Sequence, residues 1–211
     1  MNAEVLTPVL DWLDLAGVAI FALTGALVAA KEKQTLVTLS FFALITGVGG
    51  GTIRDLLIGA PVFWIADPWV AAICLVVALF AWFTPTRWWE GKFLSLADGL
   101  GLAAYAVLGT AKALEYGVPP VPGFLMGVIT GCAGGIIRDV LAGRPSILMR
   151  PELYVTAAAL SAAITVIGEL AGITRWWVWI AAALAGFALR LAAIQFNLAL
   201  PSYDERGAKA D

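Results

Sequence analysis

The sequence contains no histidine and only two cysteines, Cys74 and Cys132, both of which lie inside apolar runs. We therefore expect neither a disulfide framework nor a zinc or iron–sulfur site, because each needs several cysteine or histidine side chains. The lack of histidine also removes the commonest general base and proton shuttle. No nucleophile stands at a useful spacing from a base, so we expect no enzyme, no cofactor and no bound metal.

Charged residues are also scarce. They make up 13% of the 211 residues, whereas hydrophobic residues make up 61%, and a soluble domain is about one quarter charged. A soluble protein of this length lacks the volume to hide so much apolar surface, so lipid must cover it. The net charge of −2 gives no sign of a nucleic-acid partner. The N-terminus carries Glu4, Asp11 and Asp14 instead of a basic region, so it does not resemble a cleaved signal peptide.

Apolar runs of about 20 residues, enough for a helix to cross the hydrocarbon core, occur seven times. Prolines or charged loops separate the runs, and tryptophan pairs stand at two of their ends, Trp88–Trp89 and Trp176–Trp177, as is typical of the membrane interface. We therefore predict an all-α membrane protein with seven transmembrane helices, at about 13–30, 35–58, 68–84, 95–113, 121–143, 152–171 and 176–198.

Lysine and arginine in the connecting loops predict the orientation. One side of the membrane would hold eight of them and the other side only Arg175. Positive loops favour the cytoplasm, so we predict an outside N-terminus and a cytoplasmic C-terminus in a multi-pass protein of the inner cell membrane. The eight residues are Lys31, Lys33, Arg87, Lys92, Arg144, Arg150, Arg206 and Lys209.

The sequence repeats itself at an offset of 84 residues. The segment ITGVGGGTIRDLLIGAP (45–61) aligns without a gap to ITGCAGGIIRDVLAGRP (129–145), and Asp14 aligns to Asp98. Each copy contains three spans, an odd number, so the second copy must enter the membrane from the opposite side. We predict one transmembrane domain made of a first three-helix repeat (12–92), an inverted second repeat (93–171), a seventh helix (172–198) and a cytoplasmic tail (199–211).

Glycines cluster near the middle of the second and fifth spans, at Gly47, Gly49, Gly50, Gly51, Gly131, Gly134 and Gly135. Clustered glycine weakens a helix, so a bend or break is expected at each cluster. Broken helices at membrane depth point to a conduit or binding site near the midplane. Close helix packing is the alternative use of the same glycines.

An arginine–aspartate pair follows each cluster, Arg54–Asp55 and Arg138–Asp139. A charge at membrane depth costs about 2.5–3.5 kcal/mol on insertion scales, so these four groups must face water, protein or one another. Pairing across the pseudo-two-fold axis, Arg54 with Asp139 and Arg138 with Asp55, is one arrangement. The pairs either line an ion pathway or lock two helices together.

Three further charges have two readings each. Asp14 and Asp98 begin the first and fourth spans, where a carboxylate suits a helix N-terminus or would concentrate cations in a vestibule. Lys112 lies near the end of the fourth span, and Val28 occupies the matching position in the first copy. Its ammonium would either reach the interface or act as a gating cation.

The doubled pattern GGTIRDLLIG (50–59) and GGIIRDVLAG (134–143) resembles the prokaryotic branch of the trimeric intracellular cation (TRIC) channel family. The runs FALTGA (21–26) and ADGLGLAAYAVLGTAKALE (97–115) do so as well, and the resemblance covers roughly residues 12–198. It implies a homotrimer with a pore in each subunit, lined by the kinked second and fifth helices and passing potassium and sodium. Carried over, the pathway residues are Gly49, Gly50, Gly51, Arg54, Asp55, Gly134, Gly135, Arg138 and Asp139. Ala133 departs from the pattern, since it stands where the first copy has Gly49.

Three functions remain open on the sequence. The first is a passive channel for monovalent cations, with lipid as its surroundings. The second is a carrier for glycine or a similar zwitterion, since related bacterial sequences are described as glycine transporters. The third is a structural membrane subunit, in which the buried charges only hold helices together.

Overall fold

The computed structural model describes residues 3–89, 91–173 and 175–201, and over these it is helical apart from loops and one isolated bridge, Glu152 to Ala199. The expected tail residues Arg206 and Lys209 lie outside the described part of the chain. Each predicted span has a helix within three residues of its expected bounds, except that the first helix begins ten residues earlier than predicted, at Ala3. The helices are α1 (Ala3–Lys31), α2 (Leu36–Ile58), α4 (Pro68–Phe83), α5 (Phe93–Glu115), α6 (Pro120–Leu141), α7 (Val155–Leu170) and α8 (Trp176–Phe196). Short helical turns lie between them: α3 (Phe63–Ala66), η1 (Thr86–Trp89) and η2 (Ile147–Met149).

Five of these helices are long and apolar enough to cross a membrane by themselves: α1, α2, α5, α6 and α8. The other two predicted spans, α4 and α7, have 16 residues each. At 1.5 Å per residue each is about 24 Å long, which is shorter than a hydrocarbon core of about 30 Å. Both are the third helix of their half of the chain, so the two halves share this shortfall.

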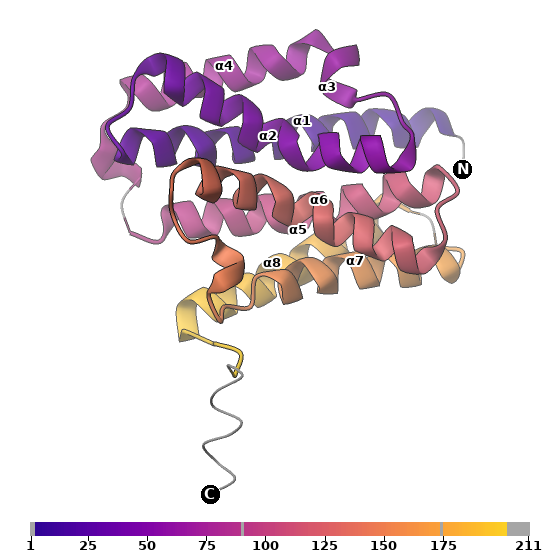
Figure 1. The fold of residues 1–211 in the computed structure, drawn as a ribbon. Coiled ribbons are helices and arrows are strands. Elements are labelled where there is room, and N and C mark those ends of the chain that lie inside the picture. The colour runs from indigo at the N-terminus through magenta and orange to yellow at the C-terminus, as the bar shows by residue number, and fades with distance from the viewer. Residues whose placement is uncertain (1–2, 90, 174, 202–211) are drawn as a thin grey trace, which may run out of the picture.

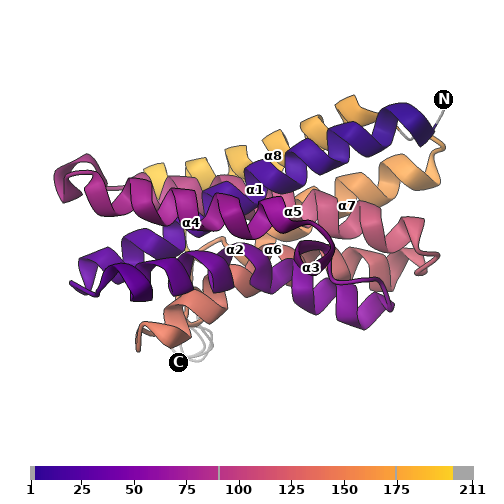
Figure 2. The ribbon, with the colours of Figure 1, turned by 90° about the horizontal axis from the view of Figure 1, so that it is seen from above.

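The long helices lie side by side along one direction, so that their loops gather at two ends (Figure 1; Figure 2). We call the end where α1 begins the N-end and the end where α8 finishes the C-end. The loops that follow α1, α4 and α6 lie at the C-end, and the loops that follow α2, α5 and α7 lie at the N-end (Figure 1). The basic loops of the described chain thus share the C-end, whereas Arg175 lies at the N-end, as the charge pattern requires.

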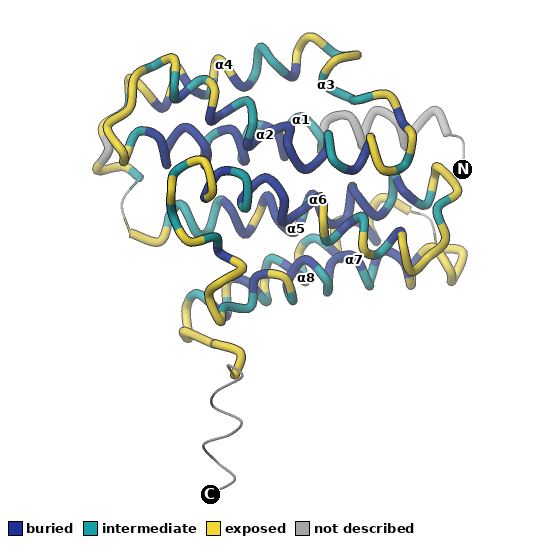
Figure 3. Tube along the Cα trace, viewed as in Figure 1, coloured by how far each residue is buried: buried dark blue, intermediate teal, exposed yellow. Residues whose placement is uncertain are grey.

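Apolar side chains cover much of the outside of the bundle. Buried residues line the contacts between helices, whereas outward faces of α4 and the loops are exposed (Figure 3). On α4, Trp69, Val76 and Phe83 are 70%, 64% and 78% exposed. A soluble monomer rarely shows so continuous an apolar face. Lipid is the solvent that suits this surface, so the chain is a multi-pass helical membrane protein.

The glycine clusters bring α2 and α6 together rather than breaking them. The sequence predicted a bend or a break at each cluster. Both helices run without interruption through their clusters, so the break is wrong. A Cβ on Gly50 would overlap the carbonyl oxygen of Thr130, and a Cβ on Gly134 would come within 2.6 Å of the carbonyl oxygen of Thr46. Only glycine allows two helix backbones to approach this closely, which is the packing use of small residues in membranes.

Contacts between the two halves are exchanged between matching positions. Thr46 and Thr130 are related by the 84-residue offset, as are Gly50 and Gly134. The rings of Phe21 and Tyr105, also related by this offset, pack in a tilted arrangement with centroids 5.4 Å apart. Each ring covers the glycine of the other helix, Tyr105 over Gly17 and Phe21 over Gly101. These two glycines therefore let α1 and α5 pack closely against each other inside the subunit.

Candidate functional site

At the C-end of the bundle, where α6 finishes, lies a buried charge cluster built around Arg138. Its Nη1 is 2.5 Å from Oδ1 of Asp98 on α5, and its Nε and Nη2 are each 3.0 Å from Oδ1 of Asp139. Nη1 also donates to the hydroxyl of Thr24 on α1, at 3.1 Å. All three charged residues are at most 8% exposed. One guanidinium thus lies between two carboxylates, which is how buried charge is tolerated.

At the N-end of the bundle, where α2 finishes, lies a related cluster built around Asp55. Its Oδ1 accepts from Nε of Arg54 and from Nζ of Lys112 on α5, both at 2.8 Å. The guanidinium of Arg54 stacks over the ring of Phe63, 5.7 Å from its centroid. Asp55 and Arg54 are almost fully buried, whereas the Lys112 side chain is 24% exposed. Here one carboxylate lies between two cations, the reverse of the C-end arrangement.

Each aspartate also holds the loop that follows its helix. Oδ2 of Asp55 accepts the backbone N–H of Phe63, and Oδ2 of Asp139 accepts the backbone N–H of Ile147, both at 3.0 Å. Phe63 and Ile147 each come eight residues after their aspartate and again differ by 84. The matching hydrogen bonds show that the RD motif folds its helix end in the same way in both halves.

Pairing across the pseudo-two-fold axis, one of the arrangements that the sequence allowed, is not the one that the structure shows. Each arginine pairs with the aspartate next to it, Arg54 with Asp55 and Arg138 with Asp139. Adjacent helical residues point about 100° apart, but the long arginine side chain bends back far enough to reach its neighbour. The partners from other helices are instead Asp98 for Arg138 and Lys112 for Asp55.

The two acidic residues assigned to span starts occupy different surroundings. Asp98 is the sixth residue of α5, is 2% exposed and belongs to the Arg138 cluster. It therefore does not cap the N-terminus of α5. Asp14 lies well inside α1 and is half-buried, close to Tyr105, whose hydroxyl donates to the Asp14 carbonyl oxygen at 3.4 Å.

The remaining glycines of the predicted pathway are packed against side chains. A Cβ on Gly49 would meet only the terminal methyl of Ile137, on Gly51 the ring of Phe63, and on Gly135 the hydroxyl of Tyr154. Gly49 and Gly50 lie where α2 faces α6, whereas Gly51 and Gly135 lie against the loops beyond the charge clusters. The structure therefore places all the predicted pathway glycines on the inner faces of α2 and α6.

A small polar cavity opens beside the C-end cluster, with a volume of about 70 Å³. Charged and polar groups from α5, α6 and the following loop line it together with three apolar side chains. The full lining is Val28, Leu94, Ser95, Asp98, Arg138, Asp139, Arg144, Ile147 and Arg150. The cavity offers both carboxylate and guanidinium groups, so it can hold water, an ion or a small zwitterion.

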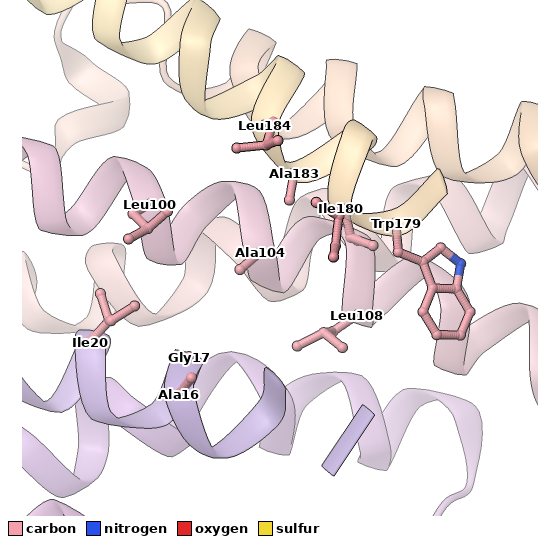
Figure 4. A pocket seen from close by; sticks show the side chains of 11 residues that line it. Ala16, Gly17, Ile20, Leu100, Ala104, Leu108, Trp179, Ile180, Ala183 and Leu184 are labelled. Carbon is pink, nitrogen blue, oxygen red and sulfur yellow. The ribbon is translucent and has the colours of Figure 1, made fainter. Parts of the chain in front are cut away.

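A larger cavity of about 220 Å³ lies between α1, α5 and α8 and is almost entirely apolar. The cavity exists because three of its lining residues are small, namely Gly17, Ala104 and Ala183 (Figure 4). Larger side chains border the rest of it: Ile20, Leu100, Leu108 and Trp179. It offers no group that replaces the hydration shell of an ion. This cavity is therefore not part of the candidate ion site.

Several neighbours of the site were not identified from the sequence. Thr24 lies in the FALTGA run, but nothing in that run marked it as a partner of Arg138, and Tyr154 lies in no motif. Arg190 of α8 pairs with Glu152 at 2.6 Å and stacks over the Tyr154 ring. Among the described residues, no group of three or more acidic, cysteine or histidine side chains lies close enough to hold a metal ion.

The sequence pattern of a family described as "Glycine transporter" matches residues 11–86 and 95–169, one match for each half. A membrane protein of Vibrio cholerae is 36% identical over 203 residues, which cover 93% of this chain and 84% of that protein. The inner membrane protein YadS of Escherichia coli strain K12 is 35% identical over 209 residues, covering 93% of this chain and 98% of that protein.

Solved structures of cation channels have the same fold. The TRIC trimeric intracellular cation channel orthologue from Rhodobacter sphaeroides is 40% identical with a TM-score of 0.83, covering 90% of this chain and 99% of that chain. A prokaryotic TRIC channel is 26% identical with a TM-score of 0.83, covering 90% and 98% of the two chains. The similarity therefore extends over nearly the whole length of both proteins.

Proposed function

Because this chain belongs to the glycine transporter family and folds like the TRIC cation channels, we propose that it is a passive channel for monovalent cations. Potassium and sodium are the proposed ions. Each subunit of a homotrimer would hold its own pathway, lined by α2 and α6.

The observation that carries this proposal is the pair of buried charge clusters at the two ends of the bundle. One lies at the N-end, where α2 finishes, and the other at the C-end, where α6 finishes. Arg54, Asp55, Arg138 and Asp139 are each at most 8% exposed. Such groups are expensive at membrane depth and are typical of ion pathways. The mutual pairing of each cluster lowers that cost in the closed arrangement, and water entering between α2 and α6 would hydrate the same groups in an open one.

The proposed pathway follows the inner faces of the two central helices. It runs from the Asp55 cluster at the N-end, past the glycine contacts, to the polar cavity at the C-end. Asp14 and Asp98 are proposed to favour cations near its two ends. The residues assigned to it are Gly49, Gly50, Gly51, Arg54, Asp55, Gly134, Gly135, Arg138 and Asp139.

The proposed topology is that of two inverted three-helix halves, residues 12–92 and 93–171, followed by α8 and a tail at 199–211. The exchanged contacts between Gly50 and Thr130 and between Gly134 and Thr46 support it. The N-end would face the outside of the inner cell membrane and the C-end the cytoplasm, since the basic loops gather at the C-end.

Reconstitution of the purified protein into planar bilayers tests the proposed function. With potassium on one side and sodium on the other, we expect discrete current steps and a reversal potential that reports the ratio of the two permeabilities. Replacing both Arg54 and Arg138 with leucine should change the unitary current, whereas Leu57→Ala, at an exposed position of α2, should not. Unchanged current in the double arginine variant would exclude a pathway between α2 and α6.

Transport of glycine is the second candidate. The C-end cavity presents the guanidinium of Arg150 and the carboxylate of Asp98, the two charges that bind a zwitterion. Uptake of labelled glycine into proteoliposomes distinguishes the two functions. Saturable uptake of glycine without discrete current steps would show that the protein is a carrier and not a channel.

A further inference from the structure

Helix α8 lies outside the two repeated halves, yet it places one buried charge beside the C-end cluster. Arg190 is 1% exposed, and its stem crosses α5 at Gly99, where an added Cβ would come within 2.7 Å of the arginine Cγ. Its Nη2 donates to Oε2 of Glu152 at 2.6 Å. Its guanidinium lies over the ring of Tyr154, 5.3 Å from the centroid. One side chain of α8 thus holds the segment that leads into α7.

The ring that Arg190 holds reaches the glycine of the second RD motif. Tyr154 is 1% exposed. A Cβ on Gly135 would lie 2.6 Å from the tyrosine hydroxyl oxygen, 3.4 Å from Oδ1 of Asp98 and 3.6 Å from Nη2 of Arg138. The hydroxyl therefore shares the space over Gly135 with two charged groups that line the C-end cavity.

Tyr154 also packs against residues on both sides of this space. It belongs to the same buried cluster as Ile147, which lines the C-end cavity, and Cys132, which lies three residues nearer the middle of α6 than Gly135. The tyrosine side chain thus lies between the cavity and the middle of α6. If the ring moved away, the cavity would extend along α6 toward the centre of the bundle.

The N-end has a matching arrangement built from different residues. Gly51 is the counterpart of Gly135, and a Cβ on Gly51 would meet the ring of Phe63 at 2.5 Å. Arg54 lies over that ring. Each of these glycines thus carries an aromatic side chain with an arginine over its face. At the N-end the arginine belongs to the RD motif, whereas at the C-end it comes from α8, because Arg138 already serves carboxylates on α5 and α6.

We propose that Arg190 is a positioning residue of the pathway, which holds Tyr154 over Gly135 and so closes the inner end of the C-end cavity. The inference rests on the proposed channel function and deepens it. A guanidinium suits this task because its flat face stacks on a ring while its edge donates hydrogen bonds. Its acceptor is fixed as well, since Glu152 forms a backbone bridge with Ala199 beyond the end of α8.

Other contacts of α8 should keep it docked when Arg190 is replaced. The hydroxyl of Ser161 on α7 donates to the carbonyl oxygen of Ala182 on α8 at 3.1 Å, and a buried apolar cluster joins α8 to α5. The side chain of Glu152 is 35% exposed, so water can hydrate its carboxylate, and Nη1 of Arg150 lies 3.8 Å from it. We therefore expect Arg190→Met to fold.

The two native thiols report on this inference in the assembled protein. Cys132 packs in the cluster of Tyr154, whereas Cys74 is buried on α4 in the first half. N-ethylmaleimide is added, and peptide mass spectrometry measures the labelling rate of each thiol. Arg190→Met should raise the rate at Cys132 at least several-fold and leave the rate at Cys74 unchanged. Arg190→Lys keeps a cation over the ring, so its rates should stay closer to those of the unaltered protein.

Ser161→Ala is the matched control for this labelling, because it removes a different buried contact of α8. It should leave both rates unchanged. Equal rises at Cys132 and Cys74 in Arg190→Met would show a general loosening of the bundle and would overturn the inference. An unchanged rate at Cys132 would overturn it too.

Currents in planar bilayers test whether the position of Tyr154 matters for conduction. Arg190→Met opens the inner end of the cavity, so its mean current should be several-fold higher than that of the unaltered protein. Tyr154→Leu keeps an apolar side chain but removes the aromatic face and the hydroxyl, so it should raise the current as well. If Arg190 acts through Tyr154, the double variant should conduct no more than Tyr154→Leu alone. Fully additive effects would contradict this.

The outcomes separate this inference from the channel function. If the unaltered protein conducts and Arg190→Met conducts equally, only this inference fails. If no variant conducts although all elute as folded oligomers, the channel function fails, and the labelling decides the rest. A selective rise at Cys132 would then retain Arg190 as the residue that closes the cavity, and no rise would reject that role too.

Discussion

Arg138 is the most constrained side chain of the candidate site. Its guanidinium holds Asp98, Asp139 and Thr24, which come from three different helices. A guanidinium supplies five donors in a fixed fork, so it can serve two carboxylates and a hydroxyl where a lysine cannot. Removing it leaves two buried carboxylates facing each other without a cation.

Replacing Arg138 with methionine should therefore lower the stability of the protein. The loss of one partner from a buried ion pair costs about 3–5 kcal/mol. The measurement is the unfolding free energy in mixed micelles, followed by circular dichroism. Adding Asp98→Asn to Arg138→Met removes one of the stranded charges and should recover part of the loss. A fully additive double variant would show that Asp98 and Arg138 do not interact.

Single residues show where the sequence was sufficient and where it was not. The doubled RD motif identified Arg54, Asp55, Arg138 and Asp139 as buried charges, because no other reading fits charges inside apolar spans. The sequence did not reveal their partners. The partners depend on how far an arginine side chain bends and on which faces of α1 and α5 are turned toward α2 and α6. The local sequence around Thr24 does not show that its helix face is turned toward Arg138.

At the scale of helices, the contact between α2 and α6 depends on two backbone approaches. Gly50 lies against the Thr130 carbonyl group and Gly134 against that of Thr46. Glycine patterns alone did not distinguish a break from close packing, since both use the absence of a side chain. The continuous helices resolve that ambiguity in favour of packing.

Gly50→Ala should separate α2 from α6 and reduce the yield of folded protein, because its Cβ would overlap a carbonyl oxygen that belongs to a rigid helix. Gly49→Ala is the matched control. Its Cβ would meet only the end of Ile137, and the second half already has Ala133 at the equivalent position. Fluorescence-detected size-exclusion chromatography compares the two. Equal elution profiles and melting temperatures would contradict this packing role.

Apart from the start of α1, which lies ten residues before the predicted one, the boundaries of the helices were predicted to within a few residues, because prolines and charges punctuate the apolar runs. Asp67 shows how one such boundary works: its Oδ1 accepts the N–H of Trp69 at 2.9 Å, and Pro68 opens α4. The short turns α3 and η2 were not predicted. They depend on hydrogen bonds that backbone N–H groups donate to Asp55 and Asp139 from eight positions further along the chain, which no local periodicity indicates.

Asp67→Ala should remove the N-cap of α4 and cost about 1 kcal/mol. The expected loss is smaller than that for Arg138→Met, since the hydrogen bond of Asp67 lies at the surface, where water can replace it. The same unfolding measurement in micelles tests this ordering. Asp67→Asn keeps an accepting oxygen at the cap, so it should lose less stability than the alanine variant.

At the scale of the whole molecule, the basic loops lie at one end of the bundle, and this position predicts which end faces the cytoplasm. The loops bearing Lys31, Lys33 and Arg144 share the C-end (Figure 1). A green fluorescent protein fused after Asp211 should therefore fluoresce, since it folds in the cytoplasm. An alkaline phosphatase fused there should be inactive, and activity of that fusion would reverse the orientation.

The exchanged contacts between α2 and α6 have a consequence for the ancestry of the fold. An interface in which one position meets another, and the matching positions meet in return, is isologous, which is the kind that two identical chains form. A single three-helix unit with glycine at position 50 and a threonine carbonyl at position 46 would carry both halves of that contact. Two copies inserted in opposite directions could therefore assemble with each other, and a later gene fusion would have freed Lys112 and Val28 to diverge.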